Sequence, residues 1–501
     1  MSIASQLPAL QIVVPLLVAP LTVLLRGSGL AWAAATAASA MAFAIAVALT
    51  LTALDGATIS YDMGGWPAPY GIELRLDAFS ALLLLLTTGA STLSLLGARD
   101  SISELMGESR EPLFYAAWLV ALAGLCGIAI TGDAFNVFVF MEISSLATYV
   151  LIAAGPDRRA LTAAFKYLIM GTVGATFYLI GVGMVYMMTG TLNFADMEVR
   201  LAEVDEVRPI VVAAGFITIG LALKAAIFPL HVWLPNAYSS APNLVTVFIA
   251  ACATKVALYV LLRFDFFVFH GNLVGHAFQF SSFLAPLAVL GILVGSAVAV
   301  VESNVKRLLA YSSVAQLGYI LLGASFGDVA GMTAAITLMF NHGLAKGALF
   351  LAIAALAMHT RGHTLADLSG AARQMPWTAA ALVIAGASLI GVPGTAGFIS
   401  KWLLLQAALQ QGPLGIAAAV AVVVGSLAAL AYVWRIIEPL YFGTAEGSTA
   451  GGSTAAYTAT PRLLLLALWL AAGANVYFGL IPAVPVSLSE LAATELLGHL
   501  R

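Results

Sequence analysis

Several titratable side chains of this sequence lie inside apolar segments, where such groups are costly and usually functional. Lys224 lies in the stretch LKAAIFPLHVWLPNAYSSAP, followed by Pro229 and His231. A proline inside a helix removes a backbone hydrogen bond, and membrane proteins tolerate this mainly where the backbone lines a cavity or contacts other helices. The combination predicts a proton or ion site at a broken helix, with His231 as a possible relay or only a cap of the break. The structural alternative is a kinked helix whose lysine reaches the membrane interface.

A second candidate is Glu142, which apolar residues surround in the run FNVFVFMEISSLATYVLIA. An isolated ionised carboxylate in such surroundings would be prohibitive in free energy, so the side chain must be protonated, solvated or paired. We expect Lys224 to be its partner. The two groups would titrate as a pair, and separation of the pair would turn Lys224 into a proton donor. Alternatively, the ion pair only fixes helix packing.

Three further segments place titratable groups inside apolar runs. Lys255 lies in VFIAACATKVALYVLL and would connect the two halves of a relay. His342 and Lys346 lie in NHGLAKGALF, four residues apart and therefore on one helix face, so a proton could pass between them through one water. Lys401 follows a second break at Pro393 in GVPGTAGFISKW, where it is a candidate terminal site or an interface lysine.

The composition identifies the elements that must position these residues. Of the 501 residues, 61% are hydrophobic and 9% are charged, and the mean hydropathy is +1.00. Long continuous apolar runs predict an all-α polytopic membrane protein and exclude an outer-membrane barrel, whose strands would alternate. The formal net charge of −3 comes without a basic cluster that would bind nucleic acid. Cys126 and Cys252 lie in apolar spans without a Cys/His cluster, so we expect neither a metal nor another cofactor.

Hydropathy predicts about fourteen transmembrane spans of roughly 20 residues. The first apolar run lacks a positively charged start and a cleavage site, so it is interpreted as a span and not as a cleaved signal. Between the spans we expect a surface hairpin within 55–75, an interfacial helix within 193–208 and a flexible loop at 443–459, with only a short tail after Pro482. The predicted spans are 9–26, 31–53, 77–97, 112–131, 134–154, 161–189, 209–239 (broken), 242–263, 283–301, 305–324, 329–357, 376–411 (broken), 414–442 and 460–482.

The distribution of basic residues predicts the orientation of the chain. Odd-numbered loops and their flanks hold twelve lysines and arginines, and even-numbered ones hold four. We therefore expect the odd-numbered loops, with Lys306 and Arg307 among them, on the cytoplasmic side of a bacterial inner membrane. Both termini are then predicted on the periplasmic side.

The order of the spans predicts two inverted repeats. Spans 4–8 and spans 9–13 each form a set of five in which the fourth member is broken, at 209–239 and at 376–411. An odd number of helices per set forces the copies into opposite orientations, and paired interrupted helices are typical of a transport site. The predicted domains are 1–110 with three helices and the hairpin, 111–265 as the first repeat, 280–442 as the second repeat, and 443–501 with a loop and a last span.

Several motifs are linked along residues 110–440: TGDAFNVFVFMEISSLATYVL, LKAAIFPLHVWLPNAYSSAP, VKRLLAYSSVAQLGY, NHGLAKGALF and SLIGVPGTAGFISKW. Together they resemble the antiporter-like subunits of respiratory complex I, the D subunits of Mrp-type multisubunit cation/proton antiporters, and membrane subunits of energy-converting hydrogenases. The resemblance implies a fourteen-helix fold and a proton path through Glu142, Lys224, Lys255 and a terminal charged residue, Lys401. One complex I subunit carries a glutamate at that terminal position.

The resemblance implies a transporter subunit and not an enzyme, namely a subunit of a multisubunit monovalent cation/proton antiporter, with a length that fits the Mrp-type D subunits. Its partners would be protons, a monovalent cation (Na+, K+ or Li+), the lipid bilayer and other membrane subunits. The alternative is a proton-pumping subunit of a complex I-like NADH/quinone oxidoreductase or of a membrane-bound hydrogenase. A stand-alone transporter of an organic solute or a purely structural subunit agrees less well with a line of buried lysines.

Overall fold

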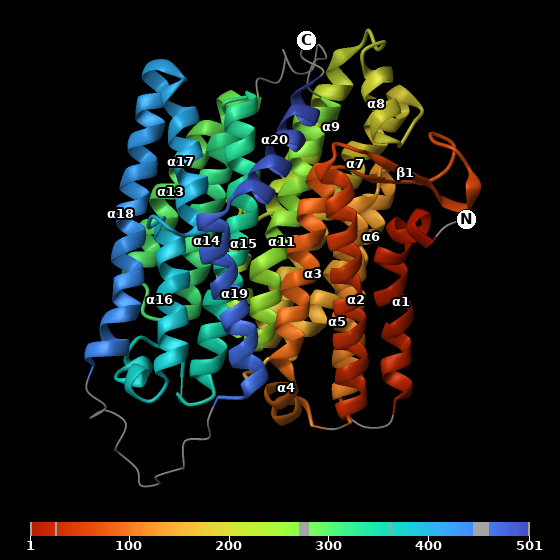
Figure 1. Ribbon diagram of the computed structural model, residues 1–501. Helices are drawn as coiled ribbons and strands as arrows, with labels where there is room; N and C mark the ends of the chain where they lie inside the picture. Colours follow the sequence, from red (N-terminus) through yellow and green to blue (C-terminus); the bar gives the residue numbers. More distant parts are fainter. Residues whose placement is uncertain are drawn as a thin grey trace.

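A computed structural model of the chain describes residues 3–25, 28–107, 109–269, 280–360, 362–443 and 460–498. Within these ranges, twelve helices are long and apolar enough to cross a membrane. Two further segments run alongside them, α14 (Val305–Ala324) and the broken pair α16 (Pro376–Ile390) and α17 (Ala396–Leu409) (Figure 1). The predicted all-α membrane architecture is confirmed, and each of the fourteen predicted spans corresponds to a helix or a broken helix.

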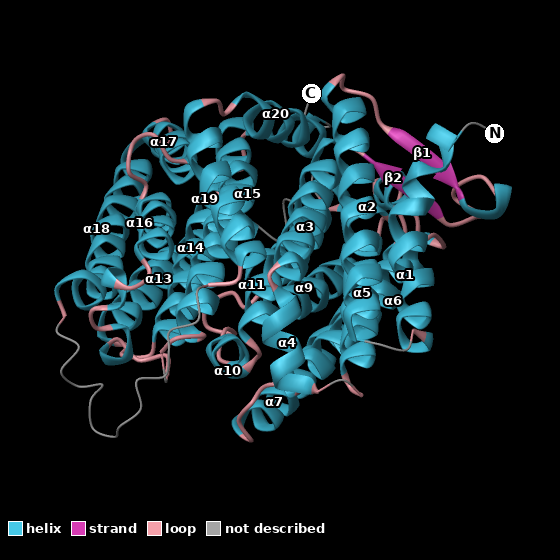
Figure 2. Cartoon of the chain, turned by 60° about the horizontal axis from the view of Figure 1, so that its bottom comes forward, coloured by secondary structure: helices cyan, strands magenta, loops and turns pink. Residues whose placement is uncertain are grey.

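The N-terminal part contains three long helices, a hairpin and short helical segments. They are η1 (Ile3–Gln6), α1 (Leu7–Leu24), α2 (Ser28–Leu54), β1 (Ile59–Asp62), η2 (Met63–Gly65), β2 (Glu73–Leu76), α3 (Ala78–Leu96) and α4 (Ala98–Met106). The two strands are antiparallel, with Ile59 opposite Leu76 and Asp62 opposite Glu73. The predicted surface hairpin is therefore confirmed, and Figure 2 shows it beside α1 and α2.

Two sets of five spans follow, and in each set the fourth span is broken, as predicted; their relation as inverted copies stays a prediction. The first set comprises α5 (Glu111–Ile130), α6 (Ala134–Ala153), α7 (Arg159–Thr189), α9 (Val207–Lys224) with α10 (Trp233–Ser240), and α11 (Asn243–Arg263), with the short α8 (Phe194–Leu201) and the π-helical turn η3 (Phe264–Val268). The second comprises α13 (Phe280–Val301), α14, α15 (Val329–Ala357), α16 with α17, and α18 (Gly412–Phe442), with η4 (Ala366–Leu368) and η5 (Ala371–Arg373). Residues 444–459 of the predicted flexible loop lie outside the described residues.

Polar residues at the starts of several helices explain where these helices begin. Asp77 and Ser80 form a reciprocal capping box at α3. The side chains of Asp133, Asn193 and Asn304 accept hydrogen bonds from the first turns of α6, α8 and α14. Such caps satisfy backbone N–H groups that have no partner within the helix.

The first broken helix differs in detail from the prediction. Lys224 is the last residue of α9 and not an interior residue, because the helix ends before Pro229 is reached. Ala226 adopts a left-handed backbone conformation with φ of 57°, which is the usual way to end a helix even though alanine rarely does so. The indole N–H of Trp233 donates to the carbonyl of Leu223 at 2.9 Å and so ties α10 to the end of α9.

The second broken helix matches the predicted Gly-Val-Pro-Gly interruption. Helix α16 ends at Ile390, and α17 begins at Ala396. Gly391 and Gly394 have φ values of 92° and 86°, a region that glycine adopts without steric cost. The break is therefore encoded by residues that the sequence displays directly.

A helix that the sequence did not predict follows the last span. Helix α19 (Arg462–Leu480) is continued by α20 (Ala483–Leu497), which packs against α15 and α3. The sequence predicted only a short tail after Pro482, and the helix within this tail was missed because two glutamates and several hydroxyl residues lower the hydropathy of the segment. Its apolar side is nevertheless buried, and prolines in a first helical turn are well tolerated.

Two faces of the molecule are used below. The hairpin face is formed by β1 and β2, the start of α3 and the end of α11, and the described parts of both termini lie on it (Figure 1). The basic face, at the opposite ends of the helices, is formed by α4, the start of α7, and the loops after α13 and α15.

Candidate functional site

The ion pair expected between Glu142 and Lys224 is present. The ammonium of Lys224, at the end of α9, lies 3.1 Å from a carboxylate oxygen of Glu142 on α6. It also donates a hydrogen bond of 2.9 Å to the hydroxyl of Ser145, one helical turn after Glu142. The side chain of Lys224 is 5% exposed and that of Glu142 is 25% exposed. The lysine is therefore buried, whereas the glutamate is partly exposed at the surface of this chain. The role of the pair in proton transfer stays a prediction.

Lys255 lies at the centre of the molecule. Among the twelve candidate membrane spans, the two that contain α11 and α15 are the most deeply buried. In each of them, 94% of the residues in an 18-residue apolar stretch are buried inside the structure. The side chain of Lys255 on α11 is completely buried, and its ammonium donates to the carbonyl of Ala250 in the same helix. Lys346 lies on α15, which packs against α11.

His342 and Lys346 lie one turn apart on α15, and both are buried. The ammonium of Lys346 donates to the carbonyl of Leu309 at 2.6 Å and to the hydroxyl of Ser312 at 2.5 Å, both on α14. Neither ring nitrogen of His342 has a hydrogen-bond partner among the described residues. A buried polar group of this kind normally bonds to water, so the position agrees with a hydrated step between titratable groups.

Lys401 points toward the end of the first half of the broken helix. Its ammonium donates to the last carbonyls of α16, at 3.2 Å to Leu389 and 2.8 Å to Ile390, and to the hydroxyl of Ser426 on α18 at 3.0 Å. It also lies 5.0 Å from the ring centroid of Tyr319. The side chain is buried, so the alternative of an interface lysine is wrong. A cation is favourable at a helix C-terminus, where the backbone dipole is negative.

Neutral hydrogen-bond acceptors surround the ammonium groups of all four lysines described above. Each ammonium is held by backbone carbonyls or hydroxyls, and within the described part of the chain only Lys224 forms an ion pair. Neutral ligands accept hydrogen bonds from a protonated lysine, but they do not fix its charge as a carboxylate would. Lys255 lies on α11, and His342 and Lys346 lie on α15, which packs against α11. Glu142, Lys224, Lys255, His342, Lys346 and Lys401 are called the lysine line below, and a proton path along this line stays a prediction.

His231 is the exception among the predicted site residues. Its ring stacks on Phe228, with centroids 5.5 Å apart, and meets Tyr311 of α14 edge-on at 6.1 Å. Its Nδ1 atom lacks a hydrogen-bond partner among the described residues. The side chain therefore lies at the contact between the two sets of helices, in the connection that contains Pro229, and no hydrogen bond joins it to Lys224 in the described structure.

The sequence did not reveal the ligands of the lysines. Ser145 could have been found because it lies one turn after Glu142, but Ser312 and Ser426 reach the site through tertiary packing. Asn341 was also missed: its amide donates to the carbonyl of Ala396 at 2.9 Å and joins α15 to the start of α17. Backbone carbonyls carry no sequence signal at all.

Lys306 is a fifth buried lysine, although the sequence assigned it only to the positively charged side of the membrane. Its ammonium donates to the carbonyl of Ala241 at 2.7 Å and to Asn243 at 3.2 Å, at the junction of α10 and α11. His363 bonds to the same Asn243 oxygen at 3.0 Å. Burial and then the charge of Lys306 lower the pKa of His363 to about 4, against the opposing effect of Asp367.

These residues border a cavity of about 740 Å³ on the basic face. It is lined by α4, the start of α7, α10 and the start of α14, and Lys306, Arg307 and Asn236 lie on its wall. Arg307 donates to Asn236 at 3.2 Å and so connects α14 to α10. The cavity therefore reaches the second half of the first broken helix. In the described part of the chain no three His, Cys, Asp or Glu side chains are grouped in a way that could hold a metal.

Comparison with known proteins identifies the relatives of this chain. The family model described as NADH:quinone oxidoreductase/Mrp antiporter, TM, matches residues 131–428. The N subunit of the NADH-quinone oxidoreductase of Desulforudis audaxviator is 42% identical over 394 residues, which cover 78% of this chain and 77% of that protein. The D subunit of the Na(+)/H(+) antiporter of Bacillus subtilis is 33% identical over 383 residues, which cover 76% of each chain.

A solved structure shares nearly the whole fold. A chain of the Mrp complex from Dietzia sp. DQ12-45-1b superimposes with a TM-score of 0.88 and 29% identity, covering 99% of this chain and 98% of that one. The similarity therefore extends beyond the matched family segment to the N-terminal helices and to α19 and α20.

Proposed function

The chain belongs to the NADH:quinone oxidoreductase/Mrp antiporter transmembrane family, and on this premise we propose that it carries protons in a multisubunit antiporter that exchanges Na+, K+ or Li+ for protons. Within that complex it is an antiporter-like membrane subunit. Exchange of the cation is a property of the complex, and the part assigned to this chain is the proton path through Glu142, Lys224, Lys255, His342, Lys346 and Lys401.

The observation that carries this proposal is the difference between Lys224 and the other buried lysines. Lys224 has a carboxylate partner at 3.1 Å, whereas Lys255, Lys346 and Lys401 have neutral ligands. While the pair is closed, Glu142 stabilises the protonated form of Lys224. When the pair opens, Lys224 is left charged in apolar surroundings, and its proton passes more readily to the next group of the line.

The geometry around the line supports this sequence of events. The cavity on the basic face is lined by the second part of α10 and by the junction of α10 with α11, so it borders the half-helix that follows the first break. His342, with two ring nitrogens that have no partner among the described residues, is placed to exchange protons through water with Lys346. The ammonium of Lys401 on α17 lies at the end of α16, and the carbonyls that hold it directly precede the second break. A movement at either break would therefore change the surroundings of a lysine.

The proposal is tested in membrane vesicles that contain the native complex. A pH gradient is formed, Na+, K+ or Li+ is added in turn, and dissipation of the gradient is recorded. We expect at least one cation to cause dissipation, and both Glu142→Gln and Lys224→Met to abolish it while the complex still assembles. Glu490→Gln, which makes the same change at an exposed glutamate of α20, serves as the control and should behave as the native complex. Normal exchange in assembled Glu142→Gln and Lys224→Met complexes would contradict the proposal.

A second candidate function is proton pumping in a redox-driven complex. It is favoured by the 42% identity to the N subunit of an NADH-quinone oxidoreductase, which exceeds the 33% identity to the D subunit of an Na(+)/H(+) antiporter. In that case no cation would dissipate the gradient, and proton movement would require an electron donor. The purified complex would then contain redox-active subunits, which absorption spectroscopy and mass spectrometry of its components would detect.

A further inference from the structure

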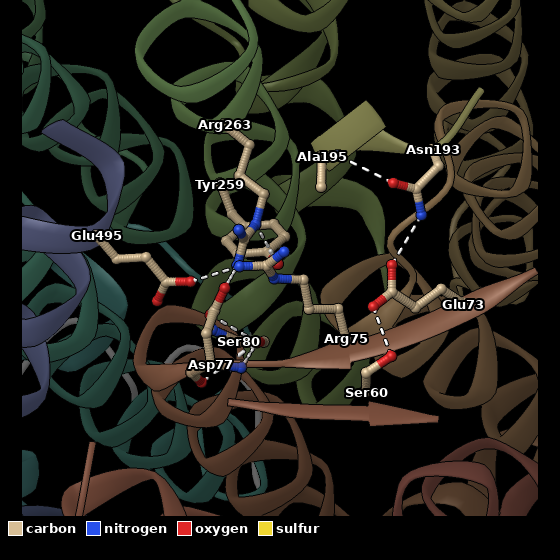
Figure 3. Close-up of polar contacts among 10 residues, drawn as sticks. All are labelled: Ser60, Glu73, Arg75, Asp77, Ser80, Asn193, Ala195, Tyr259, Arg263 and Glu495. Atoms are coloured by element: carbon tan, nitrogen blue, oxygen red, sulfur yellow. Dashed lines mark hydrogen bonds and ion pairs between the residues drawn. The ribbon is translucent and has the colours of Figure 1, made fainter. Parts of the chain in front are cut away.

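A second group of buried charges lies on the hairpin face, apart from the lysine line. Its centre is the ion pair between Asp77, at the start of α3, and Arg263, at the end of α11, whose side chains are 1% and 6% exposed. The other carboxylate oxygen of Asp77 accepts from the backbone N–H and the hydroxyl of Ser80, at 2.9 Å and 2.8 Å. Figure 3 shows that Asp77 is held from both sides in this way. Its carboxylate is therefore fixed and fully engaged.

Arg263 stands in line with the central lysine of the proton path. Lys255, Tyr259 and Arg263 are spaced by four residues on α11 and so share one face of the helix. With a rise of 1.5 Å per residue, Lys255 lies about 12 Å below Arg263 along the axis. The ammonium of Lys255 points away from Arg263, toward the carbonyl of Ala250. This face of α11 thus leads from the lysine line to the hairpin face.

Two aromatic rings fill the space between these charges. Phe79 of α3 and Tyr259 meet edge-on with ring centroids 4.7 Å apart. The guanidinium of Arg263 lies 4.8 Å from the centroid of Tyr259 and 6.0 Å from that of Phe79. The hydroxyl of Tyr259 accepts from Arg263 at 2.6 Å and donates to the carbonyl of Ala129 at 2.8 Å. A layer of two packed aromatic rings therefore lies directly beneath the ion pair, and the hydroxyl of Tyr259 is engaged by Arg263 and Ala129.

The surroundings above the pair are more exposed. Arg75 of β2 forms an ion pair of 3.0 Å with Glu495 of α20, and these side chains are 25% and 26% exposed. Glu73 accepts hydrogen bonds of 2.7 Å from both Ser60 and Asn193 (Figure 3). The side chains of the outer pair are thus more exposed than those of the Asp77–Arg263 pair, whereas Glu73 is buried like Asp77.

We propose that the Asp77–Arg263 pair, together with the rings of Phe79 and Tyr259, closes the path from Lys255 to the hairpin face against protons and cations. A guanidinium does not release its proton in proteins. The carboxylate of Asp77 is paired with Arg263 and accepts two hydrogen bonds from Ser80, and these interactions favour its charged form over a protonated one. A proton on this face of α11 therefore meets two groups that cannot relay it and two rings that exclude water.

This closure has a function only if Lys255 carries protons, so the inference rests on the proposed function. The closure means that the proton path has no exit from Lys255 to the hairpin face. A proton that reaches the centre can leave through other groups of the line, but not along α11. Without such insulation, a line of titratable groups would let protons run down their gradient without exchange for a cation. Arg263 and Asp77 are accordingly residues that block transfer, and the lysines are the residues that perform it.

The first test compares lysine with arginine. The complex is reconstituted in liposomes, a pH gradient is imposed with an impermeant cation on both sides, and passive proton flux is measured. Arg263→Lys keeps a cation beside Asp77 but introduces a group that can release its proton, and Arg263→Gln removes the cation. We expect both variants to raise the passive flux at least about fivefold. The control is Arg75→Lys, the same exchange in the outer pair, for which we expect the native flux.

The outcomes separate closure from a structural role. If the ion pair only stabilised the fold, assembled Arg263→Lys complexes would keep the native flux, and this result would overturn the proposal. Increased flux in Arg75→Lys as well would also overturn it, since the effect would then not be specific to the buried pair. If cations produced no exchange in the native complex while Arg263→Lys still leaked, the antiporter function would fail and the closure would stand.

The second test measures access without any transport. Lys255→Cys is placed in a Cys126→Ala and Cys252→Ala background, and a charged thiol reagent is applied in turn to right-side-out and inside-out vesicles. From the side of the hairpin face we expect no labelling while Arg263 is present, and labelling at least about ten times faster when Arg263→Gln is added. Labelling of the Lys255→Cys protein from that side with Arg263 intact would show an open path and would overturn the proposal.

Discussion

At the scale of single residues, the packed interior can hold buried lysines because it supplies hydrogen-bond acceptors for their ammonium groups. Lys401 uses two carbonyls at the end of α16, and Lys346 uses a carbonyl and a hydroxyl of α14. Lys224 alone combines a carboxylate with a hydroxyl. These ligands lower the cost of burying an ammonium, and their number and charge decide how firmly each lysine holds its proton.

The hydroxyl of Ser145 should therefore contribute to the working of Lys224. Ser145→Ala removes a hydrogen bond of 2.9 Å to the ammonium. A hydrogen bond to a charged group contributes about 1.5–3 kcal/mol, so we expect cation-dependent proton flux to fall by roughly tenfold. The neighbouring Ser144→Ala is the matched control, because its hydroxyl bonds only to the carbonyl of Met141 in its own helix, at 3.0 Å. Equal fluxes in both variants would show that Ser145 has no part in the transfer.

His363 should make the stability of the basic face depend on pH. Its pKa is lowered to about 4 by burial and by Lys306, whereas an unfolded histidine has a pKa of about 6.5. Between these two pKa values the unfolded chain binds more protons than the folded chain. The folded state should therefore be most stable above pH 6.5 and lose stability as the pH is lowered toward 4. The apparent Tm of the purified complex, measured across this range, should decline less in His363→Gln than in the native complex. Parallel pH profiles would contradict this assignment.

At the scale of elements, both broken helices place a lysine next to a backbone interruption. At the second break α16 and α17 approach very closely: a Cβ atom built on Gly397 would lie 1.8 Å from the carbonyl oxygen of Ser388. This close approach positions Lys401 against the last carbonyls of α16. Glycine at position 397 is therefore a requirement of the site and not only of the helix.

Gly397→Ala should accordingly separate the two halves of the broken helix. We expect a lower apparent Tm and loss of cation-dependent proton flux, because the displaced carbonyls of α16 would no longer hold Lys401. Gly215→Ala on α9 is the control, since a Cβ atom there meets nothing within 4 Å, and it should leave Tm and flux unchanged. If Gly397→Ala transported normally, the contact between the half-helices would not position Lys401.

The sequence predicted the elements better than their contacts. Proline and glycine marked both breaks, and apolar neighbours placed Lys255 inside a span, whereas Lys401 was left open between a terminal site and an interface lysine. The end of α9 was misplaced because the left-handed Ala226 has no sequence signature. Lys306 in an odd-numbered loop and Arg263, one of the four basic residues of the even-numbered loops and their flanks, were counted as loop charges, because counting basic residues for orientation assumes that charges at helix ends contact water. Their burial depends on packing between segments that lie far apart in the sequence.

At the scale of the whole molecule, the central position of α11 and α15 explains how one chain keeps a line of charges away from lipid. These helices carry Lys255, His342 and Lys346. In each of these two spans, 94% of the residues in an 18-residue apolar stretch are buried. Neighbouring helices contribute further groups: α6 supplies Glu142, α14 supplies Ser312, and α3 supplies Asp77 on the hairpin face. The line therefore exists only in the assembled bundle.

Helix α20 joins parts of this bundle that are distant in sequence. It packs against α15 of the second set and α3 of the N-terminal part, and its Glu495 pairs with Arg75 of the hairpin at 3.0 Å. Leu488, Ala492 and Leu496 are buried in these contacts. Removal of α20 would expose the side of α15 that it covers and would loosen the start of α3, where Asp77 lies.

A chain that ends after Pro482 should therefore be less stable and also leaky. We expect its apparent Tm in detergent to fall by several degrees, because buried side chains of α15 and α3 lose their packing partners, and we expect passive proton flux through reconstituted complexes to rise. Glu490→Gln, which changes an exposed charge of α20 and leaves its packing intact, is the control for both measurements. A truncated chain with native Tm and native flux would show that α15 and α3 keep their positions without α20. A lower Tm with native flux would show instead that α20 stabilises the bundle but is not needed to hold Asp77 against Arg263.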